Sequence, residues 1–170
     1  INVSAEGGTT IKYYSRDIAE NEGAVNTASI SIDRTAPQVS YTLIPSPNMY
    51  GWNRSAVEAM FSGADTLSGM DICVSSKTYI EGPGKTLVGW CRDMAGNIRY
   101  STAVVNIDVS SPIVTVNAIP LPNGAGWNNT SVTVTFNGYD AVSSNSYCTA
   151  DKTLSSEGAG QGVSGTCYDF

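Results

Sequence analysis

The sequence predicts an all-β protein made of tandem antiparallel β-sandwich modules of about 75 residues each. Three observations lead to this prediction. Motifs return at a spacing of 75 to 76 residues, hydrophobic and polar residues alternate in short runs, and cysteines recur in equivalent pairs. A fixed period of this size is the signature of a tandem array. Alternation with a period of two indicates half-buried strands, and no stretch shows a convincing helical period.

The repeat defines the module boundaries. Gly51-Trp52-Asn53 returns as Gly126-Trp127-Asn128, an offset of 75. Following the match in both directions places boundaries just before Pro37 and Pro112. We therefore expect modules of this length to be copied along the chain as building blocks.

Only one of the predicted modules is whole. Residues 37–111 form a complete module, residues 1–36 match its second half, and residues 112–170 match it as far as Met94 and so lack its last strand. A partial module cannot bury its own core. Two explanations stay open: the 170 residues are a window on a longer array, or the open edge of the third module accepts a strand from another chain.

The strands follow in order from short alternating runs that are separated by turn-forming residues. Runs with this spacing are typical of an antiparallel sandwich. Turns are predicted where glycine, proline and asparagine gather between the runs. The expected strands lie at 28–32, 39–43, 57–61, 87–91, 103–107 and 132–136, and the expected turns at 68–69, 81–84 and 95–97.

The four cysteines indicate one disulfide per module. The repeat favours Cys73–Cys91 and Cys148–Cys167 over the other pairings that four cysteines allow. Free thiols are the alternative, whereas a zinc site lacks short ligand spacings and the chain has no histidine. Disulfides imply an oxidising, extracellular setting. Closing a loop of this size stabilises a module by about 3 kcal/mol.

The composition excludes several classes of partner. The chain carries 15 acidic and 9 basic residues, a net charge of -6, which disfavours nucleic acid and anionic membrane surfaces. No stretch approaches the roughly 20 apolar residues that cross a bilayer, so no membrane insertion is expected in this window. No signal peptide is recognised in it either.

Taken together, the motifs resemble those of bacterial immunoglobulin-like repeat modules, which occur in tandem in large secreted and cell-surface proteins. The pattern runs W-N-x-(S/T)-x-V, F-x-x-x-D-x-x-S-G, C, G-x-C-x-D-x-A-G-N and I-D-x-(T/S)-x-P, and covers essentially all 170 residues. The resemblance implies an immunoglobulin-like sandwich and a spacer, adhesion or surface-assembly role, with no particular ligand. In the complete module it is carried by Trp52, Asp65, Ser68, Gly69, Asp93, Ala95, Gly96, Asn97, Asp108 and Pro112.

Two modules depart from this pattern at a glycine. Glu20 stands where the complete module has Gly96, and the segment Asp140–Ser144 lacks the expected Ser-Gly pair. We therefore expect the turn after Asp17 to be built differently from its counterpart.

Aspartates at equivalent positions are candidate calcium ligands. Calcium takes six to eight oxygens, often from several carboxylates near a module junction. The alternative is that these side chains shape turns, as in Asp93 before Ala95-Gly96-Asn97 and Asp65 before Ser68-Gly69. No other cofactor is expected. The weak calcium candidates are Asp65, Asp93, Asp108 and Asp140, with Asp169.

Four asparagines lie in Asn-x-Ser/Thr sequons, which accept glycans in secreted proteins of organisms that have the machinery. The alternative is that they only shape turns. The sequons are at Asn2, Asn53, Asn128 and Asn129.

The sequence favours a non-enzymatic extracellular structural protein, part of an array that forms a cell-surface stalk, fibre or surface layer. It has no histidine for general-base work, no unpaired cysteine under this assignment and no nucleophile or phosphate-loop motif. The partners would be neighbouring modules of the same or identical chains. One alternative is an adhesin that binds glycan or protein through exposed aromatics, for which Tyr13, Tyr14, Tyr50 and Trp52 are candidates. Another is a filament subunit that assembles by strand exchange.

Overall fold

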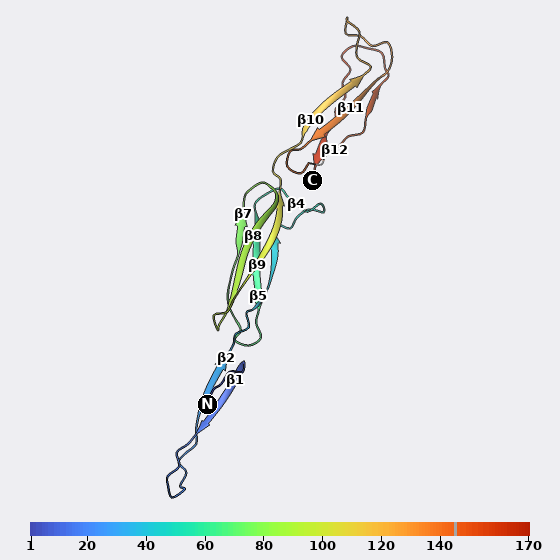
Figure 1. Cartoon of the computed structure of the whole chain (residues 1–170). Helices are drawn as coiled ribbons and strands as arrows, with labels where there is room; N and C mark the ends of the chain where they lie inside the picture. The colour runs from blue at the N-terminus through green and yellow to red at the C-terminus, as the bar shows by residue number, and fades with distance from the viewer. Residues whose placement is uncertain (145) are drawn as a thin grey trace. The chain divides into compact units, whose positions relative to one another are not determined.

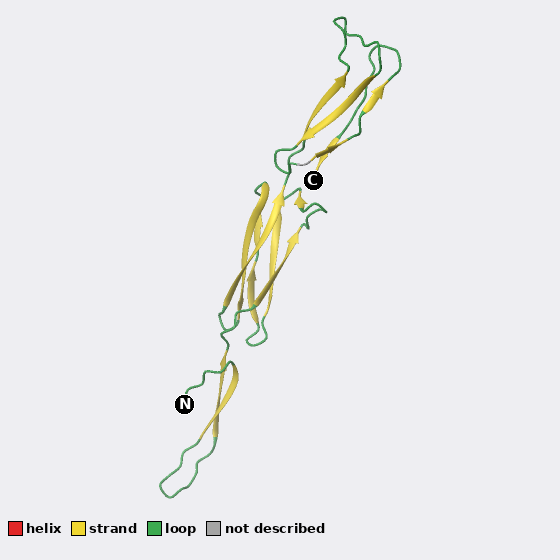
Figure 2. Cartoon of the chain, turned by 45° about the vertical axis from the view of Figure 1, so that its right-hand side comes forward, coloured by secondary structure: helices red, strands yellow, loops and turns green. Residues whose placement is uncertain are grey.

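The computed structural model describes residues 1–144 and 146–170, and these residues form strands, turns and loops without any helix (Figure 2). The all-β prediction is therefore confirmed. No described segment is a helix long and apolar enough to span a bilayer. The strands, labelled in Figure 1 where there is room, are β1 Gly7–Tyr13, β2 Asn26–Ile32, β3 Gln38–Ile44, β4 Trp52–Asn53, β5 Val57–Ala64, β6 Met70–Val74, β7 Ser76–Thr78, β8 Gly82–Asp93, β9 Ile98–Ile107, β10 Ile113–Ile119, β11 Val132–Tyr139, β12 Ser146–Cys148, β13 Lys152–Leu154 and β14 Cys167–Asp169.

These strands form five small sheets. Their orders are β1-β2, β3-β5-β7, β4-β9-β8-β6, β10-β11-β13 and β12-β14. The pairs β1–β2, β6–β8, β10–β11, β11–β13 and β12–β14 are antiparallel. The short strand β4 is an exception, because it pairs in parallel with the end of β9, Trp52 opposite Asn106 and Asn53 opposite Ile107.

The chain divides into two compact units. The first comprises residues 1–42, 59–76 and 88–103, and the second residues 43–58, 77–87 and 104–170. The first unit contains the β1–β2 hairpin, in which seven residue pairs run from Gly7 opposite Ile32 to Tyr13 opposite Asn26. The side chains of β2 are exposed as far as Ser31.

An aromatic ring packed on a glycine marks the core of the first unit. Phe61 of β5 is 6% exposed and lies against Gly89 of β8, so residues of the β3-β5-β7 and β4-β9-β8-β6 sheets meet there. A Cβ at Gly89 would lie 2.1 Å from the Phe61 ring. The ring of Tyr41 on β3 flanks Phe61 at a centroid distance of 5.8 Å. The disulfide Cys73–Cys91 lies beside this contact, next to Gly63.

The second unit repeats this arrangement. Phe136 of β11 is 8% exposed and lies on Gly165, where a Cβ would approach the ring to 2.6 Å. The disulfide Cys148–Cys167 again lies beside it, next to Gly138. Packing of an aromatic ring, a glycine and a disulfide is therefore a property of the repeat. The buried cluster here is Val134, Phe136 and Cys167, with Ala118, Val132, Cys148, Leu154 and Val163 packed against it.

Both disulfides join directly opposed residues on neighbouring strands of one sheet. Cys73 on β6 is opposite Cys91 on β8, and Cys148 on β12 is opposite Cys167 on β14. This is the pairing that the repeat predicts. No other cysteine is present in the chain.

The expected difference in the turn after Asp17 is wrong. Asp17 Oδ1 accepts from the Asn21 amide at 2.9 Å, just as Asp93 Oδ1 accepts from the Asn97 amide at 2.8 Å. Glu20 adopts a φ of 71°, in the left-handed region where glycine is usual, and so preserves the turn. Side-chain and backbone hydrogen bonds to Asp17 hold a conformation that costs an ordinary residue about 1–2 kcal/mol.

We expect Gly89→Ala to lower the free energy of unfolding by about 1–3 kcal/mol, because its methyl group would displace the Phe61 ring from a packed core. Gly8→Ala is the matched control, since Gly8 lies in β1 with no atom near the added Cβ. Urea unfolding followed by circular dichroism measures both. Equal midpoints for the two variants would show that the ring–glycine contact is not tightly packed.

Candidate functional sites

Three aspartates meet where the β1–β2 hairpin leads into the next repeat. Asp33 follows β2, Asp65 follows β5 and Asp93 ends β8. Their carboxylate oxygens all lie within 4.8 Å of one another. Asp93 is buried and the other two are half-buried. We call this group the first triad; it could hold a metal ion.

A second triad occupies the equivalent positions one repeat later. It comprises Asp108 after β9, Asp140 after β11 and Asp169 at the end of β14, again with carboxylate oxygens within 4.8 Å. Asp108 and Asp140 are 3% exposed. The sequence pattern pointed to four of these positions and to Asp169, and the structure brings them together in two groups.

The pattern missed Asp33, the member of the first triad that comes from the preceding repeat. Its signal is the offset of 75 that relates Ile32-Asp33 to Ile107-Asp108. Calcium needs six to eight oxygens, and each triad residue offers one in this geometry, so backbone and water would have to complete the shell. Calcium binding therefore stays a prediction.

The same carboxylates also shape turns. Asp65 Oδ1 accepts from the backbone amides of Leu67 at 3.0 Å and Gly69 at 2.9 Å. Asp33 Oδ2 accepts from the Ser68 amide at 2.9 Å. A hydrogen bond to a charged group contributes about 1.5–3 kcal/mol. Two carboxylates 4 Å apart repel by about 1–4 kcal/mol, depending on the effective dielectric constant. The amide hydrogen bonds therefore offset much of the repulsion in the triad.

The electrostatic balance differs between the triads. Burial, followed by the charges of Asp108 and Asp140, raises the pKa of Asp169. Hydrogen bonds, chiefly from the Ser68 side chain, lower the pKa of Asp33.

A glutamate holds the end of the last strand of a repeat. Glu81 Oε1 accepts from the backbone amides of Val109 at 2.8 Å and Ser110 at 3.0 Å, and from the Ser110 hydroxyl at 3.1 Å. Glu6, 75 positions earlier, accepts likewise from the Arg34 amide and the Thr35 hydroxyl. We call Glu81 and Glu6 the strand clamps. The sequence pattern missed both, because their partners lie 28 to 29 residues away.

Three further contacts hold the same strand end. The Asn106 side chain accepts from the Gly84 amide at 2.8 Å and donates to the Gly51 carbonyl at 3.1 Å. The Asp108 amide donates to the Asn53 carbonyl at 2.9 Å. Together with the Glu81 clamp, these bonds surround Asn106–Ser110 with polar partners, while Ile107 is 1% exposed in the core.

The sequons differ in accessibility. Asn53 is 4% exposed and its side-chain amide donates to the Pro45 carbonyl at 3.4 Å, which argues against a glycan there. Asn128 is half-buried and donates to the Pro120 carbonyl at 2.8 Å. Asn2 and Asn129 are exposed. Glycosylation at these three asparagines stays a prediction.

The aromatic residues named for ligand binding do not form one surface. Tyr13 and Tyr14 are about half exposed in the first unit, and Tyr50 stacks on Phe170 in the second unit at a centroid distance of 4.2 Å. Trp52 is half-buried.

Compared with protein-family models, with curated proteins and with solved structures, the chain gives no match. The class that its fold defines is an all-β chain with antiparallel sheets and a disulfide in each unit. The resemblance to immunoglobulin-like repeats rests on the sequence motifs alone.

We expect Glu81→Gln to lower the urea midpoint at pH 7. The hydrogen bond from the Val109 amide, with those from Ser110, lowers the pKa of Glu81 below its usual 4.5. The stabilisation by the carboxylate is therefore present above pH 4.5 and lost as the pH falls through the lowered folded-state pKa. The difference between wild type and variant should narrow in that acidic range.

The exposed Glu22→Gln serves as the control for this substitution. Unfolding midpoints measured from pH 7 down to pH 2 decide the prediction. A difference that stays constant over the whole range would mean that the charge of Glu81 does not hold the strand end.

Proposed function

We propose that the chain is a non-enzymatic extracellular structural protein, part of an array of immunoglobulin-like sandwich modules that forms a cell-surface stalk, fibre or surface layer. The observation that carries this proposal is that structural supports recur position by position. The strand clamp returns after 75 residues, and so do the aspartate triad and the aromatic ring on its glycine. Such repetition is expected of a building block whose surroundings also repeat.

The connection between repeats supports an array. The side chain of Asp33 accepts from the Ser68 amide, and its carbonyl accepts from the Asn97 side chain at 3.2 Å. One repeat later, the side chain of Asp108 accepts from the Ser143 amide at 3.1 Å. Each repeat thus ends on a residue that bonds to the loops of the next, and a chain of further repeats could use the same connection.

The chemistry of the chain is consistent with this role. The disulfides indicate an oxidising compartment, from which we infer an extracellular location. The net charge of -6 disfavours nucleic acid as a partner. The carboxylates that lie closest together serve as acceptors for backbone amides, a structural use that explains their positions without catalysis.

Two measurements on the native protein test the proposal. Antibodies raised against the chain should label intact source cells, and peptide mapping without reductant should recover Cys73–Cys91 and Cys148–Cys167. Permeabilised cells processed in parallel are the control. Labelling that requires permeabilisation, or free thiols at all four cysteines, would contradict an extracellular structural role.

A further inference from the structure

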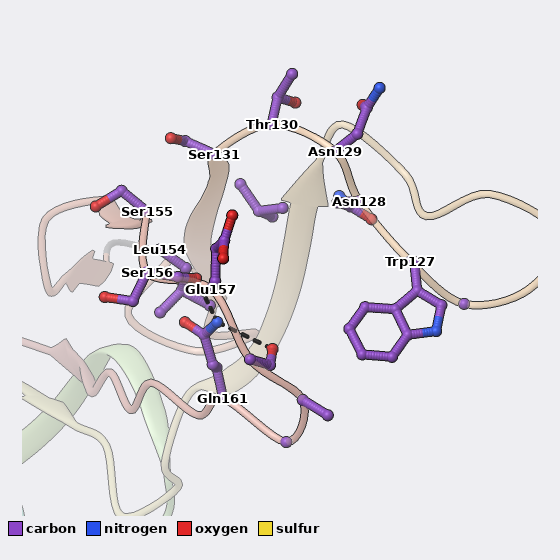
Figure 3. A pocket seen from close by; sticks show the side chains of 15 residues that line it. Trp127, Asn128, Asn129, Thr130, Ser131, Leu154, Ser155, Ser156, Glu157 and Gln161 are labelled. Atoms are coloured by element: carbon purple, nitrogen blue, oxygen red, sulfur yellow. Dashed lines mark hydrogen bonds between the residues drawn. The ribbon is translucent and has the colours of Figure 1, made fainter.

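The second unit contains an open pocket of about 800 Å³. It is lined by two segments, Gly126–Val132 and Leu154–Gln161 (Figure 3). Trp127 and Asn128 lie on one side, across from Ser156, Glu157 and Gln161 (Figure 3). The Gln161 side chain donates to the carbonyls of Ser156 and Gly158 and so holds the second segment in a compact loop.

Both lining segments have counterparts in the complete repeat. Glu157-Gly158-Ala159-Gly160-Gln161 corresponds to Glu81-Gly82-Pro83-Gly84-Lys85, and Gly126–Val132 corresponds to Gly51–Val57. The backbones agree as well. The paired glycines have φ values of 137° and 122° at the first position, 70° and 63° at the second, and 84° in both copies before the tryptophan.

The turn that carries Trp127 also repeats its counterpart. Asn123 Oδ1 accepts from the amides of Ala125 and Trp127 at 3.0 Å, as Asn48 Oδ1 does from those of Tyr50 and Trp52. The pocket is therefore made from the same backbone as the part of the complete repeat that surrounds Asn106–Ser110.

In the complete repeat, this backbone binds an extended strand. Gly51, Asn53, Glu81 and Gly84 each hydrogen-bond to the segment Asn106–Ser110. The parallel pairing of Trp52–Asn53 with Asn106–Ile107 fixes its register. Main-chain hydrogen bonds of this kind supply affinity for an added strand, and side-chain pockets supply specificity.

We propose that the pocket accepts an extended protein strand with an Asn-Ile-Asp-x-Ser/Thr segment, bound in the register of residues 106–110. The asparagine of that strand bonds to Gly126 and Gly160, and its isoleucine enters the core beside Phe136. The amides around its Ser/Thr are held by Glu157, which acts as the clamp. This inference deepens the proposed function, because it names what completes this repeat, and it rests on the same equivalence of repeats.

The asparagine decides which strand fits. The segment Asn106–Ser110 contains it, whereas β2 has Ser31 at that position before Ile32-Asp33. A serine hydroxyl is too short to bridge the Gly51-type carbonyl and the Gly84-type amide as the Asn106 side chain does. The β2 segment should therefore bind more weakly than the β9 segment, although both carry the apolar face of a last strand.

The test titrates a synthetic peptide of residues 96–111 into the 170-residue chain, with isothermal titration calorimetry as the readout. We expect saturable binding of one peptide per chain and a higher urea midpoint with peptide present, since a ligand that binds only the folded state stabilises it. A peptide with Asn106→Ala and Ile107→Asp should bind at least tenfold more weakly, and a peptide of residues 21–36 should also bind more weakly.

Substitutions in the protein locate the binding. Glu157→Gln should weaken the peptide by about tenfold, because it removes the charge that receives the strand amides. Glu6→Gln, in the other unit, is the matched control and should leave affinity unchanged. Peptide mapping of Cys148–Cys167 checks that each variant is folded.

Three outcomes would overturn the inference: no saturable binding, equal binding of the intact and doubly substituted peptides, or unchanged affinity of the Glu157→Gln chain. Any of them, with cell-surface labelling intact, would remove this inference and leave the proposed function standing.

Discussion

The fold depends on carboxylates that accept hydrogen bonds from backbone amides at the ends of strands. Asp65 and Asp140 do this after equivalent strands, Asp17 and Asp93 do it in equivalent turns, and Glu81 does it across 28 residues of sequence. Short sheets leave many amides unpaired at their edges, and each buried unpaired amide costs free energy. Only 14% of the residues are charged, yet these acidic residues stand where a strand ends. Their charge therefore serves the backbone more than solubility.

The period of the sequence predicted much of this architecture because it related residues that local patterns cannot relate. It paired the cysteines correctly, since copies of a module place equivalent residues in equivalent contacts. Alternation located β5, β8, β9 and β11, where one face of the strand is buried. By contrast, β4 has only two residues and pairs in parallel with β9, so no periodicity could reveal it.

The candidate sites were harder to predict, because their partners are distant in the chain. Asp33 belongs to a triad whose other members are 32 and 60 positions later, and Glu81 lies in a glycine-rich turn that looks like ordinary surface. The turn after Asp17 shows a different error. Absence of glycine was taken to change the backbone, but several hydrogen bonds outweigh the cost of a left-handed Glu20. Ser144 takes a φ of 61° where Gly69 has 82°, a second case of the same tolerance.

The position of the disulfides has a mechanical consequence for a chain that spans a distance under tension. Each bridge joins two strands of one sheet and encloses a segment with a sequence separation of 18 or 19 residues. When the ends of such a chain are pulled, force passes through the bridge and bypasses the enclosed segment. An extended residue contributes at most about 3.3–3.6 Å, so each bridge withholds roughly 60 Å of contour length from extension. A repeat that opens under load would therefore lengthen by only part of its chain, and the enclosed strands would stay in register for refolding.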